Sequence, residues 1–290
     1  MTTKEEDEIA QILSANTHDD VYFFTNRGRV FKIKAYDLPE GSRQAKGQAV
    51  VNLINIEQEE KLTAILAQGK SDTFKFLLMA TDNGTVKKTK LSEFDSIRQS
   101  GKIAIKLDAA DSLKWVKPTS GTDHILMVSR QGKSIRFKEE DVRPTARDTM
   151  GVRGIELKGG DSVIGMEVFP STKAAPTDRR RKTFEDVLII MEKGLGKRTG
   201  VKNWPLQKRG GQGVKAAQIA DKTGTIISCI AVDETIDQVV LTSRQAQVIK
   251  LPLKNIPSLG RDTQGVILMR FSKKGDSVSA VTCLEKDPES

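Results

Sequence analysis

Cysteine, histidine and aromatic residues are all scarce in this chain of 290 residues, which has two cysteines, two histidines and 5% aromatic residues. Cys229 and Cys283 lie too far apart for a C-x-x-C pair, and two cysteines make no disulfide framework. We therefore interpret both as small hydrophobic core residues. His18 and His124 have no cluster of cysteine, histidine or carboxylate residues at ligand spacing, so we expect no metal site.

Long apolar runs are absent as well. No stretch approaches the ~20 apolar residues that cross a bilayer. Residues 1–9 are acidic, whereas a signal peptide would begin with basic residues and continue with apolar ones. We therefore expect a cytoplasmic protein that does not contact membranes.

The sequence patterns of common catalytic sites are missing too. No G-x-S-x-G nucleophile elbow occurs. The segment Gly194-Leu-Gly-Lys-Arg-Thr199 resembles a phosphate loop only faintly, because it lacks the upstream glycine and has no Ser or Thr directly after the lysine. A hairpin turn accounts for it better. We expect no catalysis by this chain alone, no cofactor in it and no small-molecule substrate.

Acidic residues are outnumbered by basic ones. There are 47 Lys and Arg residues against 38 Asp and Glu, a formal net charge of +9. Residues 1–20 carry a net charge of −5 and residues 281–290 one of −2, which leaves +16 for residues 21–280. A positive field of this kind favours a polyanionic partner. Because no amphipathic helix or lipidation motif supports a membrane, we predict that the partner is nucleic acid.

The chain repeats one pattern five times. A strand, a tight turn and a second strand recur, with the turns centred on residues 28, 84, 132, 194 and 246. Glycine accepts the positive φ that such hairpin turns require. Ala246 replaces it in the fifth turn, where we expect either a negative φ or strain. The basic residues four places after the turns are Lys32, Lys88, Arg136, Arg198 and Lys250.

A second signature follows each hairpin and ends in glycine. Its basic residues are Arg43, Arg98, Arg147, Lys208 with Arg209, and Arg261. A strand is expected after each signature, at residues 50–56, 103–107, 155–157, 214–219 and 266–271. A further apolar run, such as residues 62–67 or 278–283, completes about four strands per repeat.

Repeats of ~40–50 residues with four strands each are typical of propeller blades. We predict a single all-β domain over residues 1–290, with blades at about 21–70, 71–121, 122–170, 183–235 and 236–285. We interpret residues 1–20 as a partial blade whose opening strands are missing. Residues 170–183 contain four consecutive basic residues and prolines without periodicity, so we expect a basic loop inserted between blades.

Basic residues that recur in register indicate a binding surface. If the blades form a ring, the two sets of basic residues form rings too. Regularly spaced cations suit the backbone of double-stranded DNA and give sequence-independent, salt-sensitive binding. The alternative interpretation is that each charge protects an edge strand from aggregation. Neither a recognition helix nor interleaved aromatic residues accompany the cations, which disfavours the reading of bases and the binding of single strands.

The segment Gln207-Lys208-Arg209-Gly210-Gly211-Gln212-Gly213 resembles the Q-R-R-G-G-x-G box of the DNA gyrase A C-terminal domain family. Other segments resemble the same family, at residues 15–20, 47–55, 83–89, 101–107, 151–155, 196–199 and 260–266. The resemblance implies a six-bladed β-pinwheel whose first blade is incomplete here. It also implies that the basic rim wraps DNA with positive hand and so supports negative supercoiling driven by ATP. The implied DNA-binding residues are both sets of cations together with Gln207, Lys208, Arg209, Gly210, Gly211 and Gly213.

The resemblance further implies that this domain acts together with the remainder of gyrase A and with gyrase B, on the chromosome in the bacterial cytoplasm. ATP and Mg²⁺ would be used by other domains of that type IIA topoisomerase. In the family the essential box belongs to the first blade, whereas here it stands in what would be the fifth. One alternative is the equivalent C-terminal domain of topoisomerase IV, which guides decatenation. Another is a propeller scaffold that binds proteins, which salt-insensitive partner binding would favour.

Overall fold

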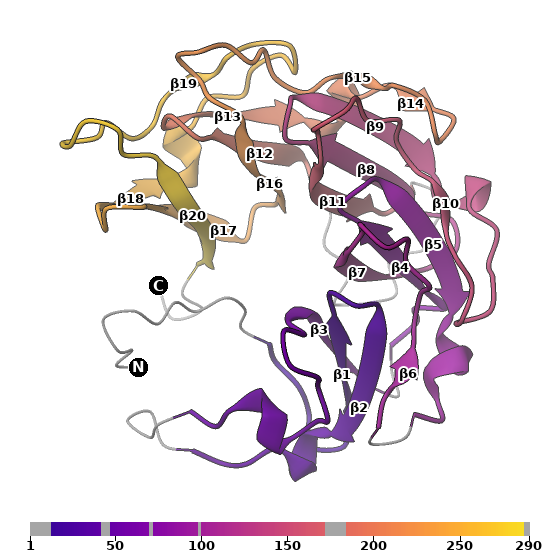
Figure 1. The fold of residues 1–290 in the computed structure, drawn as a ribbon. Helices are drawn as coiled ribbons and strands as arrows, with labels where there is room; N and C mark the ends of the chain where they lie inside the picture. The colour runs from indigo at the N-terminus through magenta and orange to yellow at the C-terminus, as the bar shows by residue number, and fades with distance from the viewer. Residues whose placement is uncertain (1–12, 42–46, 70–71, 98–99, 172–183, 287–290) are drawn as a thin grey trace. The chain divides into compact units, whose positions relative to one another are not determined.

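The computed structural model describes residues 13–41, 47–69, 72–97, 100–171 and 184–286. Its regular elements are β-strands and short 3-10 helices (Figure 1), so the prediction of an all-β fold is confirmed. The chain divides into two compact units. The first unit comprises residues 1–81, 86–121 and 143–151, and the second comprises residues 82–85, 122–142 and 152–290.

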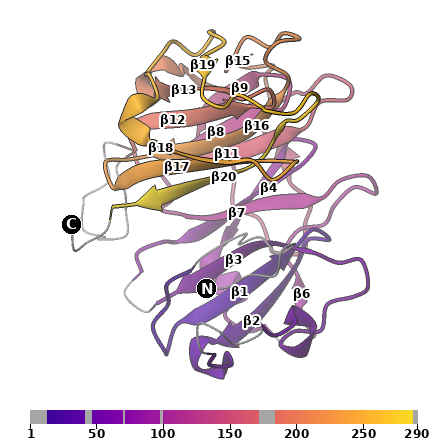
Figure 2. The ribbon, with the colours of Figure 1, turned by 90° about the vertical axis from the view of Figure 1, so that its left-hand side faces the viewer.

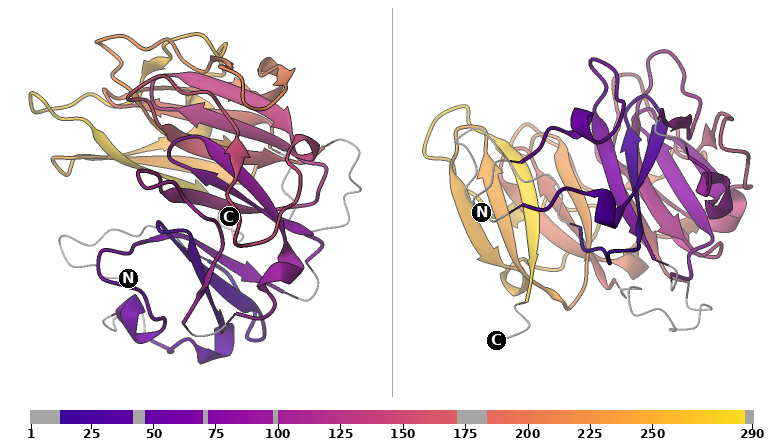
Figure 3. Two further views of the ribbon diagram at one scale, coloured as in Figure 1. Left: turned by 45° about the vertical axis from the view of Figure 1, so that its right-hand side comes forward. Right: turned by 90° about the horizontal axis from the view of Figure 1, so that it is seen from below.

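The first unit contains two antiparallel sheets. In one, β1 pairs with β2 and β3, and β2 also pairs with β6; in the other, β4 pairs with β5 and β7. The indigo and purple strands of the first of these sheets lie side by side in both views of Figure 3. The strands are β1 (Asp20–Thr25), β2 (Arg29–Lys34), β3 (Leu62–Gln68), β4 (Phe76–Thr81), β5 (Thr85–Lys90), β6 (Lys102–Ile103) and β7 (Leu113–Thr119), and the 3-10 helices are η1 (Ala35–Asp37), η2 (Val50–Asn52) and η3 (Leu91–Phe94).

The second unit contains three sheets built on the same plan. β8 pairs with β9 and β11, β12 with β13 and β16, and β17 with β18 and β20. Figure 2 shows β17 between β18 and β20. The strands are β8 (His124–Ser129), β9 (Lys133–Lys138), β10 (Val152–Arg153), β11 (Val163–Phe169), β12 (Asp186–Met191), β13 (Leu195–Gly200), β14 (Leu206–Gln207), β15 (Val214–Lys215), β16 (Ile226–Val232), β17 (Ile236–Ser243), β18 (Val248–Pro252), β19 (Val266–Ile267) and β20 (Val278–Glu285), and the 3-10 helices are η4 (Glu139–Asp141), η5 (Val201–Asn203) and η6 (Leu253–Asn255).

Each repeat begins with a hairpin whose first strand is the most buried of its sheet. In β1, β4, β8 and β12, five consecutive residues are buried after a half-buried first residue. The middle of each of these strands is an unbroken run of apolar or aromatic residues, because a strand that is covered on both faces needs no polar side. The hairpin interpretation of residues 194–199 is confirmed, since β12 and β13 pair across that turn.

The outer strand of a sheet comes from the next repeat along the chain. β6 follows the second hairpin but pairs with β2 of the first. In the same way β14 and β15 pair with β9, and β19 pairs with β13. The chain then bends beneath the hairpin turn of that earlier repeat, where the N–H groups of Ala104 and Ile105 donate to the Gly28 carbonyl at 2.7 and 3.2 Å. Backbone hydrogen bonds from a donated outer strand therefore join one repeat to the next.

The turn glycines meet two requirements at once. Gly28 and Gly194 have φ values of +74° and +81°, in the region that favours glycine. A Cβ on Gly194 would also lie 2.3 Å from the carbonyl oxygen of Met269, in the segment given by the next repeat. Ala246 has a φ of 63°, so the strained form of the fifth turn is the one that occurs. Among the described residues the fifth sheet receives no donated strand.

Several expected strands are wrong or too long. Residues 50–56 begin with the 3-10 helix η2, because the Val50 carbonyl accepts the N–H groups of Leu53 and Ile54 at 3.0 and 3.1 Å. The strands expected at residues 103–107, 214–219 and 266–271 have only two residues each, in β6, β15 and β19. At 155–157 the strand β10 has already ended. After β6, β10, β15 and β19 the chain leaves the sheet because its next N–H groups donate to the glycine carbonyl of a hairpin turn.

The prediction of six blades is also wrong. The described residues form five sheets, and β1 begins only at Asp20. Residues 13–19, part of the partial blade expected at 1–20, lie in no strand. Instead the Asp19 carboxylate accepts the Asn16 N–H at 2.8 Å and closes a turn that leads into β1. Residues 1–12 and most of the basic loop expected at 170–183 lie outside the described residues.

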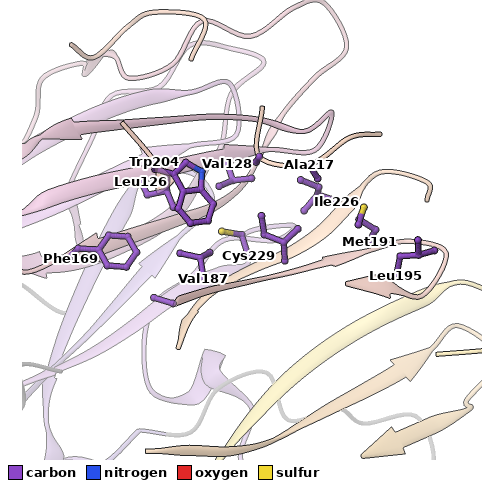
Figure 4. Packing of buried hydrophobic residues seen from close by; sticks show 13 residues of the cluster. Leu126, Val128, Phe169, Val187, Met191, Leu195, Trp204, Ala217, Ile226 and Cys229 are labelled. Atoms are coloured by element: carbon purple, nitrogen blue, oxygen red, sulfur yellow. The ribbon is translucent and has the colours of Figure 1, made fainter. Parts of the chain in front are cut away.

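The cores lie between neighbouring sheets of each unit. In the second unit, side chains of β8, β11, β12 and β16 form one cluster around Trp204. Figure 4 shows the Trp204 indole close to Leu126, Val187 and Cys229. The indole Nε1–H donates to the Ser134 hydroxyl at 3.1 Å, which satisfies its polar group. Cys229 is buried as expected, whereas Cys283 is only half-buried.

Candidate nucleic-acid interface

The first set of predicted site residues occupies one register of the sheets. Lys32, Lys88, Arg136, Arg198 and Lys250 pair with the equivalent residues Tyr22, Leu78, Leu126, Leu188 and Val240 on the first hairpin strand. The structure therefore places these five residues equivalently, as the repeat pattern predicts. Their surroundings differ from those of a free cationic surface.

Two arginines of this set bind the 3-10 helix of the following repeat. Arg136 donates from Nη1 to the carbonyls of Val201 and Trp204 at 3.1 and 3.3 Å. Its other contact is from Nη2 to His124 Nδ1 at 2.9 Å, and burial lowers the pKa of this guanidinium. Arg198 donates from Nε to the Ile256 carbonyl at 2.7 Å and forms an ion pair with Asp186 at 3.1 Å. Both guanidinium groups therefore serve internal contacts.

The lysines of the first set differ in their surroundings. Lys32 donates to the Asp95 carbonyl and lies 3.6 Å from the Asp20 carboxylate. Lys88 is 4% exposed, and its Nζ lies 5.0 Å from the centre of the Phe76 ring. Lys250, in the sheet without a donated strand, is exposed. Four of the five cations thus have internal partners, and DNA contact by this set stays a prediction.

The second set lies on loops that precede the outer strands. Arg147, Arg209 and Arg261 donate from Nη1 to the carbonyls of Ile103, Arg153 and Lys215 at 2.6, 3.0 and 2.8 Å. In all three cases the acceptor is the second residue of an outer strand. Each arginine is half-buried, while Lys208 is exposed. Arg43 and Arg98 lie outside the described residues.

The box at residues 207–213 forms a tight loop between β14 and β15. β14 runs parallel to β9 and β15 antiparallel to it, so the loop must reverse direction within a few residues. Gly210 and Gly213 have positive φ, and a Cβ on Gly213 would lie 2.1 Å from the Ser134 carbonyl oxygen. Gly211 and Lys208 are exposed, and Gln207 is half-buried. Backbone geometry thus requires glycine at positions 210 and 213, and the loop presents Lys208 to solvent.

Sequence reasoning missed a group of exposed cations on and just after the outer strands. Arg153 and Lys215 stand at the second position of β10 and β15, and Lys106 and Arg270 follow β6 and β19 by three residues. The signal was a basic residue two to five places after the last glycine of each of these loop signatures. Guanidinium and ammonium groups are the side-chain groups that commonly donate to phosphate oxygens.

Other kinds of site find little support in the part of the chain that the structure describes. No group of three or more His, Cys, Asp and Glu side chains there could hold a metal ion. Nor is any described helix long and apolar enough to span a membrane.

Five repeated sheets with outer strands donated by the next repeat define a β-propeller-type repeat domain. The family model described as "DNA gyrase C-terminal domain, beta-propeller" matches residues 19–68, 75–120, 123–170, 185–233 and 237–285. The chain therefore belongs to the DNA gyrase C-terminal domain family.

The curated relatives agree with this assignment. The A subunit of DNA gyrase from Escherichia coli (strain K12) is 40% identical over 270 residues, which cover 93% of this chain and 29% of the relative. The corresponding gyrase protein of Staphylococcus aureus (strain NCTC 8325 / PS 47) is 38% identical over 292 residues, covering 100% of this chain and 31% of the relative. The chain thus spans less than a third of the length of these relatives.

Two solved structures have the same fold. The DNA gyrase A C-terminal domain aligns with a TM-score of 0.71 and 26% identity over 92% of this chain and 83% of that one. The C-terminal domain of DNA topoisomerase IV aligns with a TM-score of 0.83 over 98% of this chain and 84% of that one. Because its identity is 22%, the topoisomerase IV likeness concerns the fold alone.

Proposed function

We propose that this chain binds double-stranded DNA through its arginine loops, as a DNA-binding domain of a type IIA topoisomerase of the gyrase kind. The observation that carries the proposal is the placement of Arg147, Arg209 and Arg261 at one equivalent position against the outer strands. A guanidinium has five N–H donors in a planar fork that suits phosphate oxygens. Membership of the gyrase C-terminal domain family supports the same partner.

We further propose that DNA wraps over these loops with positive hand, and that wrapping supports ATP-dependent negative supercoiling. The partners are then the remainder of gyrase A together with gyrase B, on the chromosome in the bacterial cytoplasm. ATP and Mg²⁺ act in other domains, and this chain supplies no chemistry. Because the contacts are with phosphate, binding is independent of sequence and weakens as salt rises.

A ligation assay tests the wrapping directly. The protein is bound to nicked circular DNA, the nick is sealed, the protein is removed and the linking number is measured. We expect a positive shift that grows with protein concentration. Tight binding without a shift contradicts wrapping and favours the topoisomerase IV alternative, whereas salt-insensitive binding of a protein partner in place of DNA favours the scaffold alternative.

Paired variants locate the interface. The double variant Arg147→Ala/Arg261→Ala should reduce the linking-number shift and flatten the slope of log affinity against log salt by about 1.8, at about 0.9 per lost phosphate contact. The matched control is Lys61→Ala/Lys114→Ala, which removes the same charge from exposed lysines at or beside β3 and β7. In their sheets β3 and β7 form the edge on the side away from β2 and β5, the second strands of the two hairpins. Equal losses in the two double variants would contradict the assignment of the loops.

A further inference from the structure

Two lysines are buried beneath the arginine loops. Lys87 of β5 and Lys197 of β13 are 1% and 0% exposed. They occupy one register, because Lys87 pairs with Met79 and Lys197 with Ile189 on the first hairpin strand. In the other three sheets the residue at this register is apolar, namely Phe31, Ile135 and Ile249. Packing at this position therefore does not require a lysine.

The Lys197 ammonium group is surrounded by carbonyls of one loop. Its Nζ donates to the carbonyl oxygens of Gly260, Arg261 and Thr263 at 2.9, 2.6 and 3.0 Å. Three carbonyl acceptors match the three N–H donors of a protonated lysine. The loop that it holds is the loop that carries Arg261.

Lys87 makes the same kind of contact in the first unit. Its Nζ donates to the carbonyl of Arg147 and, at 2.8 Å, to that of Ala104. The two loops share the sequence Arg-Asp-Thr, at residues 147–149 and 261–263. In both, the threonine hydroxyl donates at 2.8 Å to the carbonyl three residues earlier. The same loop is thus built twice around a buried ammonium group.

Holding an ammonium group in this place is unfavourable for stability. Burial is the largest cause that lowers the pKa of Lys87 and Lys197 to about 8. Asp262 opposes and Arg261 reinforces the lowering at Lys197, while Asp148 and Glu93 oppose and Arg147 reinforces it at Lys87. Apolar residues occupy the equivalent position in the three other sheets. We therefore expect the charged lysines at these two positions to have a role other than packing.

We propose that Lys87 and Lys197 are positioning residues, which fix the backbone of the Arg147 and Arg261 loops so that each guanidinium meets a DNA phosphate. Neither lysine contacts DNA in this arrangement. Each loop is held at two points, by the lysine under its backbone and by the arginine Nη1 on the outer-strand carbonyl. The inference rests on the proposed function, since it presumes that these arginines bind DNA.

The test uses the 290-residue chain and the double variant Lys87→Met/Lys197→Met. Ile249→Met is the control, because it places a methionine at the same register in the sheet without a donated strand. Duplex affinity is measured by fluorescence anisotropy. We expect the double variant to bind about three- to tenfold more weakly at neutral pH, as for the loss of one or two well-placed phosphate contacts. The control should bind like the wild type.

A double-mutant cycle shows whether the lysines act through the arginines. In the background Arg147→Ala/Arg261→Ala, the two Lys→Met changes should have no further effect on affinity, because the groups that they position are gone. An equal loss in that background would mean that the ammonium charges act on DNA by themselves, and the proposal would be wrong.

The pH profile separates positioning from a purely structural role. Between about pH 7 and about pH 9.5 the wild-type ammonium groups lose their protons, so wild-type affinity should fall towards that of the double variant, whose affinity changes less. Over the same range the unfolding free energy contributed by these groups should rise. A structural role would make affinity follow stability, and that outcome overturns the inference. This measurement on the wild type alone decides the matter if the variant does not fold.

The outcomes distinguish the two proposals. Wild-type protein that binds no duplex overturns the proposed function and the positioning role together. Salt-sensitive wild-type binding with Lys→Met variants that match Ile249→Met at both pH values overturns only the positioning role.

Discussion

Replacing Gly194 by alanine tests the exchange of outer strands. The new Cβ would lie 2.3 Å from the Met269 carbonyl oxygen, so the donated segment must move. That movement breaks the hydrogen bonds from the N–H groups of Leu268 and Met269 to the Gly194 carbonyl, at 2.8 and 3.0 Å. Each such bond contributes about 1 kcal/mol. The positive φ adds about 1 kcal/mol of strain for an alanine, so we expect a loss of about 3 kcal/mol in the free energy of unfolding.

Gly275 provides the matched control. Its φ of +82° equals that of Gly194 within a degree, but nothing lies within 4 Å of its Cβ position. Gly275→Ala should therefore lose only the strain, about 1 kcal/mol. Urea unfolding followed by circular dichroism measures both variants, with the midpoint shifting and the slope unchanged. Equal losses in the two variants would refute the reasoning, because the donated segment would then add nothing.

Three further predictions concern buried polar groups. Glu60→Ala should lower the free energy of unfolding by about 3 kcal/mol, because the Glu60 carboxylate accepts from Arg29 at 2.8 Å, from the buried Thr25 hydroxyl at 2.5 Å and from the Glu57 N–H at 2.9 Å, and all three bonds are lost; urea unfolding at neutral pH measures this, and an unchanged midpoint would contradict it. Trp204→Phe removes the bond to Ser134 and should cost about 1 to 2 kcal/mol, and Ser134→Ala should cost less in that background than in the wild type. For Lys197 the folded pKa of about 8 lies below the unfolded value of 10.5, so the unfolded state binds more protons between these values and stability should rise with pH relative to Lys197→Met. Unfolding midpoints at about pH 7 and about pH 9.5 check the sign, and a falling difference would show that the ammonium stabilises the fold.

Much of the fold could be predicted because the hairpins are local. The apolar runs at β1, β4, β8 and β12 and the turn glycines define each hairpin without knowledge of the rest of the chain. Alternation also indicates an outer strand near residues 103 and 266, but it carries no information about the partner. The pairing of β6 with β2, in which Lys102 lies opposite Val30, joins segments of different repeats and depends on tertiary packing.

The predicted strands are wrong or too long where the N–H groups of a short segment could bond to more than one acceptor. Residues 50–56 have the apolar composition of a strand, yet their N–H groups close a 3-10 turn on the Val50 carbonyl. Beyond β6, the residues Ala104 and Ile105 look like a continuing strand, but both N–H groups turn to Gly28. Composition alone does not show which acceptor an N–H group will find.

The candidate site shows why recurrence in a sequence does not by itself indicate a binding surface. Lys32, Arg136 and Arg198 each donate to a carbonyl at the end of the next repeat's 3-10 helix, so an internal contact accounts for their recurrence in three repeats. Lys250 is exposed in the one described sheet that receives no donated strand, which is what an internal role predicts. The loop arginines recur too, and each donates from Nη1 to an outer-strand carbonyl, while Arg209 also donates from Nε to the Asp141 carbonyl at 2.8 Å. The two sets differ in what they bind, which is the end of the next repeat's 3-10 helix for Lys32, Arg136 and Arg198 and an outer-strand carbonyl for the loop arginines, and these partners come together only in the folded chain.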